Sequence, residues 1–452
     1  MKKWSLNRKM AVALIAGSGC GILFMLWKQQ LLSSGQTALW ERVYRWLFAD
    51  ISAPGNETAI GLFYVIGKLF VRCLQLVIIP MVFTSIVSAM MRISDATKLS
   101  RISLKTLGFF LFTTVMGILL ASIFGLTFYH LGFFNRTDLA LTLHEGSVAQ
   151  NPLNIVVNAV PDNITTAFSQ NSGVLAVVVL ATTVGFLCHQ LQNKIHIIPQ
   201  ICEEVNAIIV QFLLMVIHLF SPLAIFCLLT RSFACYGSTY LRPALSYIGA
   251  TTLLLLIFLI GAYSLFVKQF VKVSPLPFLR KMGKIAMFGF STSSSAATLP
   301  LNMQTTVKEL GVQEEIASFV LPLGMTINMD GTAIMQIMAT IFIAGCAGYP
   351  LPFSKLLFIG ILAIVASVGT PAAPGAGAVI LFTILSGVGF TSEAALTAYS
   401  LILAINRPIE MLVTALNVVG DSACALAVAK SEGAFAEETY LCRKEMVGQE
   451  KI

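Results

Sequence analysis

Up to residue 284, long apolar segments alternate with short polar ones. A helix needs about 20 largely apolar residues to cross a bilayer. Six segments approach or exceed that length, near residues 10–27, 64–91, 105–133, 174–191, 208–229 and 244–266. No A-x-A-like cleavage site follows the first one, so it is expected to stay in place as a span. The pattern therefore predicts six transmembrane helices in this part of the chain.

Beyond residue 284 the apolar pattern is interrupted three times, by STSSSAATLP at 291–300, NMDGT at 328–332 and GTPAAPGAG at 369–377. Gly and Pro at such density do not fit a regular spanning helix. Non-helical backbone at membrane depth is tolerated only where it lines a cavity. We expect the first and third interruptions to be tips of re-entrant hairpins, related as a weak repeat, and the second to break a seventh span.

Four polar residues follow one another along the last apolar segment, 404–429: Glu410, Thr414, Asn417 and Asp421. Spacings of four, three and four residues place them on one face of a helix. Carboxylates facing lipid would be very unfavourable, so this face must line a protein-walled or watery cavity. The segment is the eighth predicted span. The predicted fold is an all-α polytopic membrane protein with eight transmembrane helices and two re-entrant helical hairpins.

Composition and charge agree with a membrane protein. Of 452 residues, 57% are hydrophobic and 11% charged, against about 25% charged in soluble domains. The net charge of +8 comes from short basic loops such as 92–105 and 268–284, so it indicates topology rather than nucleic acid. The basic loops 92–105 and 268–284 are expected on the cytoplasmic side and the acidic loop 135–172 on the opposite side, which places both termini in the cytoplasm. The spacing of the nine Cys matches neither a disulfide framework nor a metal-binding motif. The sequence also lacks a recognisable nucleophile–base pair, which argues against an enzyme.

Two interrupted motifs have alternative interpretations. A Ser-rich run such as 291–295 is often a linker, but this one adjoins apolar segments, and at a hairpin tip its hydroxyl and N–H groups suit a carboxylate. Asp330 could be a structural acid. However, the alternation of Thr326, Asn328 and Asp330 does not fit one helix face. An unwound turn there would present oxygen ligands that suit Na⁺.

The order of these motifs resembles that of the glutamate transporter family, the dicarboxylate/amino acid:cation symporters. The matching pieces are FVR at 70–72, IPMVF at 79–83, TLP at 298–300, NMDGT, GTPAAPGAG, and NVVGD at 417–421. The resemblance covers residues 60–430. It implies a homotrimer in a bacterial inner membrane, with a scaffold of residues 1–100 and 134–240, a mobile transport domain of residues 101–133 and 241–435, and a cytoplasmic tail, 436–452. It also implies alternating access, with the second hairpin as a gate.

The resemblance implies three sodium sites. Its first set of ligands is the Asp421 carboxylate with the carbonyls of Gly324, Asn328 and Asn417. The second set is Asp330, the Asn328 side chain, Thr113 and Thr114. The third is the carbonyls of Thr326, Ser367, Val368 and Thr370, near Met329. Phe110 stands where archaeal members have Tyr, a departure that weakens the second site.

The resemblance also implies a substrate pocket. Its α-carboxylate binders would be Ser294, Ser295, Thr414 and Asn417, and Glu410 would hold the α-ammonium group. Further lining residues would be Met329, Thr332, Ala373, Gly377 and Val413.

Val413 occupies the position where members with acidic substrates carry Arg, and Asn406 replaces a nearby Asp. A Val offers no guanidinium to a second carboxylate. Arg407 is a substitute anion binder in principle, but it points about 100° around the helix from Asn406. We therefore expect a sodium-coupled symporter or exchanger of small neutral amino acids. An acidic amino acid or C4-dicarboxylate carrier is the alternative, and an anion channel is a third, which would pass current without substrate.

Overall fold

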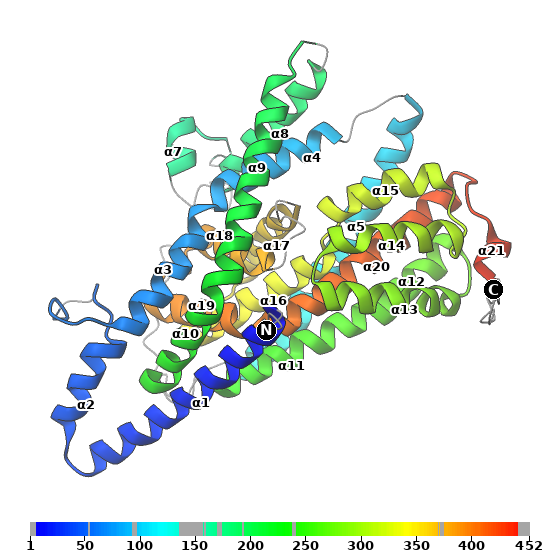
Figure 1. Ribbon diagram of the computed structural model, residues 1–452. Coiled ribbons are helices and arrows are strands. Elements are labelled where there is room, and N and C mark those ends of the chain that lie inside the picture. Colours follow the sequence, from blue (N-terminus) through cyan, green and yellow to red (C-terminus); the bar gives the residue numbers. More distant parts are fainter. Residues whose placement is uncertain are drawn as a thin grey trace, which may run out of the picture.

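The computed structural model describes residues 6–52, 55–92, 97–134, 157, 160–169, 174–191, 194–236, 241–368, 370 and 375–441. These residues are mostly helical and contain no strand (Figure 1). The helices before residue 270 are α1 (Leu6–Ser33), α2 (Thr37–Val43), α3 (Leu62–Leu76), α4 (Ile78–Arg92), α5 (Thr97–His130), α7 (Ile164–Ser169), α8 (Val174–Gln190), α9 (Ile197–Met215), α10 (Ser221–Tyr236), α11 (Leu241–Ile257) and α12 (Tyr263–Phe266). The later ones are α13 (Pro275–Thr292), α14 (Ser295–Lys308), α15 (Glu314–Ile327), α16 (Asp330–Ala347), α17 (Phe353–Val368), α18 (Ala376–Gly387), α19 (Glu393–Ile405), α20 (Arg407–Ser431) and α21 (Glu437–Leu441).

Seven helical segments among the described residues are long and apolar enough to cross a membrane. They are Arg8–Ser33, Leu62–Ser88, Arg101–His130, Ile197–Cys235, Arg242–Val271, Glu314–Ala347 and Arg407–Ser431. The all-α polytopic membrane fold is thereby confirmed. The span predicted at 174–191 corresponds to α8, which is apolar but shorter than these seven. The count of eight spans therefore stays a prediction.

Two predicted spans differ in continuity from the helices observed. The segment predicted at 208–229 is the middle of one helix of 39 residues, Ile197–Cys235, in which a π-helical turn, Val216–Phe220, joins α9 to α10. The segment at 64–91, which contains the span Leu62–Ser88, is divided at Val77 into the helices α3 and α4. Pro80 lies in the first turn of α4, where a missing N–H breaks no helical hydrogen bond.

The interrupted segments form two helical hairpins and one broken helix. Helix α13 packs against α14, and α17 against α18. The turn of the first hairpin is shorter than predicted, because only Ser293, at φ +51°, and Ser294 separate the two helices. The Ser294 hydroxyl caps α14 by accepting a hydrogen bond from the Ala297 N–H. The predicted break in span seven is present at Asn328 and Met329, between α15 and α16. Re-entry of either hairpin into a membrane stays a prediction.

The helices pack in two groups (Figure 1). In one, α10 packs against α1 and α3, and α4 packs against α8 and α9. In the other, α20 is contacted by α5, α13, α14, α15 and α16. The division of the chain into a scaffold and a transport domain stays a prediction. Most of loop 135–172 and of tail 436–452 lies outside the described residues.

A buried hydrogen-bond network fastens the first hairpin to α20. Asn302 of α14 donates from Nδ2 to the Val418 carbonyl over 2.9 Å and accepts at Oδ1 from the Ser422 hydroxyl over 2.7 Å. The Ser422 hydroxyl also lies 2.9 Å from that of Thr306. An unsatisfied buried donor or acceptor costs about 1–3 kcal/mol.

We predict that Asn302→Ala lowers the free energy of unfolding of the detergent-purified protein by about 1–3 kcal/mol, seen as a lower melting temperature. The control is Ser291→Ala in the same hairpin, because the Ser291 hydroxyl is exposed and bonds only its own helix. Equal melting temperatures for Asn302→Ala and the control would contradict this role.

Candidate functional site

Asp330 lies at the break between α15 and α16, and it is fully buried. Each of its carboxylate oxygens accepts a hydrogen bond: Oδ1 from the Thr114 hydroxyl at 2.5 Å and Oδ2 from the Tyr263 hydroxyl at 2.9 Å. Its place in the first turn of α16 adds the favourable field of a helix N-terminus. This buried acid is thus held by donors from α5, α12 and its own helix end.

Asp421 lies opposite the same break, on α20, and is 2% exposed. Its Oδ1 accepts from Asn328 Nδ2 at 3.0 Å, and Asn328 Oδ1 lies 3.5 Å from the Thr113 hydroxyl. Helix α15 approaches closely here: a methyl group on Gly324 would lie 2.5 Å from Asp421 Oδ1. Asn328 therefore connects α5 to α20 through the unwound turn.

Asn417 lies one helical turn before Asp421 and bonds to the start of α16. Its Oδ1 accepts from the Gly331 N–H at 2.8 Å. Its Nδ2 lies 3.3 Å from the Thr332 hydroxyl and 3.6 Å from the Met329 sulfur. One amide thus joins residues predicted for the cation sites to residues predicted for the substrate pocket.

The structure brings together most of the first two predicted sodium sets. Carboxylate, amide and hydroxyl oxygens gather around the unwound turn, a donor set that suits a hard cation such as Na⁺. The third set is not joined by side-chain contacts: the hydroxyls of Thr326, Ser367 and Thr370 bond carbonyls of their own segments, and Val368 ends α17. Its carbonyl ligands stay a prediction.

The start of α18 lies against α16. Gln336 Nε2 donates to the Gly377 carbonyl at 3.2 Å, and a methyl group on Gly377 would lie 3.2 Å from Thr332 Cγ2. This places the second hairpin beside the predicted substrate residues of α16. Ala373, also predicted there, lies outside the described residues.

The first hairpin reaches the same region from the other side of α20. A methyl group on Gly289, near the end of α13, would lie 3.6 Å from the Thr414 carbonyl. Ser295 is buried at the start of α14, next to the capping Ser294. The Thr414 hydroxyl bonds the Glu410 carbonyl of its own helix at 3.0 Å. The first hairpin therefore packs on α20, whereas the second packs on α16.

Glu410 has an ion-pair partner. Its Oε2 lies 3.5 Å from Arg407 Nη1, and both side chains are about a tenth exposed, at 11% and 10%. A methyl group on Gly375, which precedes α18, would lie 4.0 Å from the same oxygen. The Asn406 side chain also reaches Glu410, and its Oδ1 accepts from the Tyr247 hydroxyl at 2.8 Å.

Two residues of the site escaped the sequence analysis, Tyr263 and Gln336. Tyr263 is an isolated aromatic residue at the end of an apolar span, where aromatic side chains are common. Gln336 is a single amide in α16 and has no motif around it. Their contacts join helices distant in sequence, so no local pattern could have identified them.

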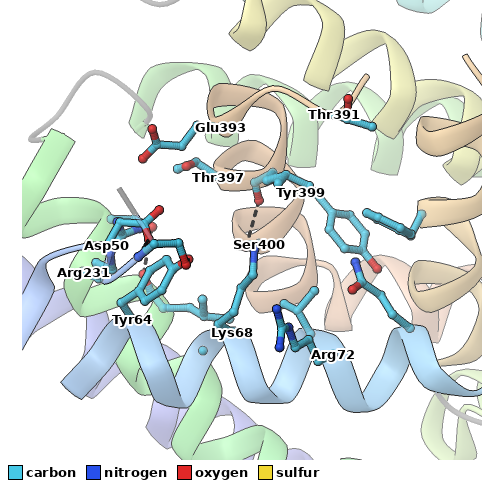
Figure 2. A pocket seen from close by; sticks show the side chains of 18 residues that line it. Asp50, Tyr64, Lys68, Arg72, Arg231, Thr391, Glu393, Thr397, Tyr399 and Ser400 are labelled. Carbon is cyan, nitrogen blue, oxygen red and sulfur yellow. Dashed lines mark hydrogen bonds between the residues drawn. The ribbon is translucent and has the colours of Figure 1, made fainter. Parts of the chain in front are cut away.

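A separate cavity of about 610 Å³ opens between α3, α10 and α19 (Figure 2). Lys68 and Arg72 enter it from α3, Arg231 from α10, and Glu393 and Ser400 from α19. None of the residues predicted to bind substrate or sodium lines it. The predicted pocket therefore lies elsewhere in the molecule.

A buried, cation-suited centre inside an all-α membrane fold is typical of secondary transporters. The profile of the sodium:dicarboxylate symporter family matches residues 6–431, so the chain belongs to that family. The predicted resemblance is thereby confirmed, as is the expectation that the protein is a transporter rather than an enzyme.

Three relatives illustrate the family. The proton/sodium-glutamate symport protein of Geobacillus stearothermophilus is 27% identical, over 85% of this chain and 91% of its own. Human excitatory amino acid transporter 5 is 25% identical, over 87% and 79%. C4-dicarboxylate transport protein 2 of Bradyrhizobium sp. (strain ORS 278) is 26% identical, over 86% of each chain. These names agree better with the acidic amino acid or dicarboxylate alternative than with the predicted neutral substrate.

We predict that Gly324→Ala weakens sodium binding about 10-fold or more, a change of about 1.4 kcal/mol, because the methyl group would displace the Asp421 carboxylate. The rise in melting temperature with added NaCl, relative to choline chloride, measures this binding. Gly283→Ala is the matched control, since nothing lies within 4 Å of its new methyl group. An unchanged sodium response in Gly324→Ala would place Asp421 outside the cation site.

Proposed function

We propose that this protein is a sodium-coupled secondary transporter of an acidic amino acid that works by alternating access. The observation that carries the proposal is the position of Asn417. Its amide contacts Gly331 and Thr332 at the start of α16, directly beside Asp330, and it lies on the same face of α20 as Asp421 and Glu410. Cation and substrate would therefore share one amide.

Shared ligands provide a physical basis for coupling. A cation that draws Asn328 and Asp421 together also orients α20, and a substrate that binds Asn417 orients the same helix. Coupling between two sites is reciprocal, so each ligand raises the affinity for the other. A gradient of the cation can then drive uptake of the substrate.

Glu410 supports an amino acid as the substrate. Its carboxylate is largely buried and suits an ammonium group. A C4-dicarboxylate has no ammonium group and would meet a like charge at this position. The names of the relatives favour substrates with a second carboxylate, so an acidic amino acid fits both arguments.

A small neutral amino acid is the second candidate, and Val413 is the observation in its favour. Val413 is 6% exposed, and its backbone packs on Gly331 at the start of α16. It brings an apolar surface where the family resemblance implies an Arg in carriers of acidic substrates. An anion channel is less well supported, because a channel has no need of an ammonium-binding carboxylate.

The assembly we propose follows from the resemblance and from the loop charges. Residues 1–100 and 134–240 would form the scaffold of a homotrimer, and residues 101–133 and 241–435 the transport domain. Both termini would lie in the cytoplasm of a bacterium, with the spans in its inner membrane. The contacts of Gly375 and Gly377 support the second hairpin as the gate.

We predict that uptake into proteoliposomes requires a sodium gradient, and that Asp421→Asn raises the half-saturating sodium concentration about 10-fold or more, because it removes one of the few charged ligands that set cation affinity. Substrate affinity should fall with it. Asp162→Asn is the control, since Asp162 is an exposed acid outside the site. Equal uptake in choline and sodium buffers, driven by a pH gradient, would overturn sodium coupling.

Competition among amino acids tests the substrate class. We expect aspartate or glutamate to inhibit sodium-driven uptake at lower concentrations than serine or alanine, because the pocket holds a guanidinium as well as a carboxylate. Stronger inhibition by serine or alanine would favour the second candidate. In that case Val413→Arg should depress neutral amino acid uptake and allow aspartate to bind.

A further inference from the structure

We propose that Tyr263 is a ligand of the sodium ion that binds at Asp330, and that its hydroxyl group bonds the carboxylate while the site is empty. The inference rests on the proposed function, because it assumes that sodium binds at the unwound turn. It adds to the second predicted set of ligands a residue from the sixth predicted span, near 244–266, which no motif or helix periodicity indicated.

Tyr263 lies in a helix that is irregular on both sides of it. Helix α12 consists only of Tyr263–Phe266, with one π-helical turn before it, Phe258–Ala262, and another after it, Val267–Val271. A π-helical turn takes in more residues than an α-helical turn, so it changes which side chains face a neighbouring helix, and such turns are frequent at functional sites. Both turns and α12 pack against α20. The irregular stretch thus coincides with the contact to the helix that carries Asp421.

The Tyr263 hydroxyl reaches the centre of the predicted sodium ligands. The side chain is 1% exposed, and its hydroxyl donates to Asp330 Oδ2 at 2.9 Å. A methyl group on Gly420 would lie 2.2 Å from the same hydroxyl oxygen and 3.2 Å from Asn328 Nδ2. Glycine at position 420 thus leaves room for both side chains against α20. The phenol oxygen therefore lies beside the carboxylate and the amide of the unwound turn.

The aromatic residue that α5 brings to this centre has no oxygen to offer. A methyl group on Gly324 would lie 3.1 Å from Cζ of Phe110, whose ring is 2% exposed. The end of the phenyl ring thus faces the centre without a polar atom, although a hard cation prefers oxygen ligands. The hydroxyl groups that bond Asp330 come instead from Thr114 and Tyr263.

A tyrosine hydroxyl suits both the empty and the occupied site, because it is a donor and an acceptor at once. In the structure it donates to Asp330 Oδ2, which satisfies a carboxylate whose burial would otherwise be very unfavourable. A cation beside the carboxylate would take the place of this hydrogen bond. The O–H bond would then rotate so that a lone pair of the oxygen faces the ion, and no proton leaves the tyrosine.

The test measures sodium binding to the detergent-purified full-length protein as the rise in melting temperature with NaCl, relative to choline chloride. Tyr263→Phe should raise the half-saturating sodium concentration about 10-fold or more, the lower end for loss of a group that supports a metal ligand. Tyr440→Phe is the matched control, because Tyr440 is also fully buried and its hydroxyl donates to the Ser274 carbonyl at 2.6 Å, outside the predicted sodium sets. The control should lower the melting temperature without changing the half-saturating concentration.

A second readout follows the phenol itself. In protein labelled with 3-fluorotyrosine, the fluorine NMR signal that is missing from Tyr263→Phe should shift when NaCl is added, because the hydroxyl changes its partner. The signal that is missing from Tyr440→Phe should stay in place. If Tyr263→Phe fails to fold, Gly420→Ala should weaken sodium binding in the same way, since its methyl group would displace the phenol. Gly249→Ala, whose methyl group has nothing within 4 Å, is the control for that variant.

An unchanged half-saturating sodium concentration in Tyr263→Phe would overturn this inference, and so would a lower one, which would show that the hydroxyl only competes with the ion for Asp330. In both cases the wild-type protein would still respond to sodium, and the proposed function would stand. No sodium response in the wild-type protein would instead refute sodium coupling itself.

Discussion

The cost of placing charge inside a bilayer governs this structure. Asp330, Asp421 and Glu410 all lie in segments that are otherwise apolar, and none of them can face lipid. Each is therefore enclosed by other helices and supplied with a donor. The helices that carry them are the most deeply buried: Glu314–Ala347 is fully buried along its apolar window, whereas only 18% of the window in Arg8–Ser33 is buried. The outer helices screen the charged centre from lipid.

The same cost made much of the fold predictable. An apolar segment of spanning length has few options in a membrane, and a cluster of Gly, Pro and Ser within it must end or break a helix. The break at Asn328 and Met329 followed directly from this argument. The continuity of the other helices could not be predicted in this way. The π-helical turn at Val216–Phe220 and the junction at Val77 depend on packing between helices. The first hairpin turn is shorter than predicted because Ser294 caps α14. The sequence alone did not show which serine of the run would be the cap.

The site divides in a similar way. Asp421, Asn417 and Glu410 were predicted together because a single helix carries them at regular spacing, and Asp330 because an acid beside Gly in an apolar run stands out. Tyr263 meets Asp330 from a helix 67 positions earlier, and no periodicity records such a contact. Arg407 was visible in the sequence but was compared with Asn406. Arg407 forms an ion pair with Glu410, and only the structure shows that its side chain points toward that residue.

The Arg407–Glu410 pair also has an electrical consequence. In the alternating-access mechanism proposed above, the pocket returns across the membrane field without sodium or substrate after each delivery. The internal ion pair contributes no net charge to that step, so the transmembrane voltage does no work on it. Each elementary charge that crosses the full field is worth about 2.3 kcal/mol per 100 mV. By pairing Arg407 with Glu410, the pocket avoids that work for both of these charges when it crosses the field.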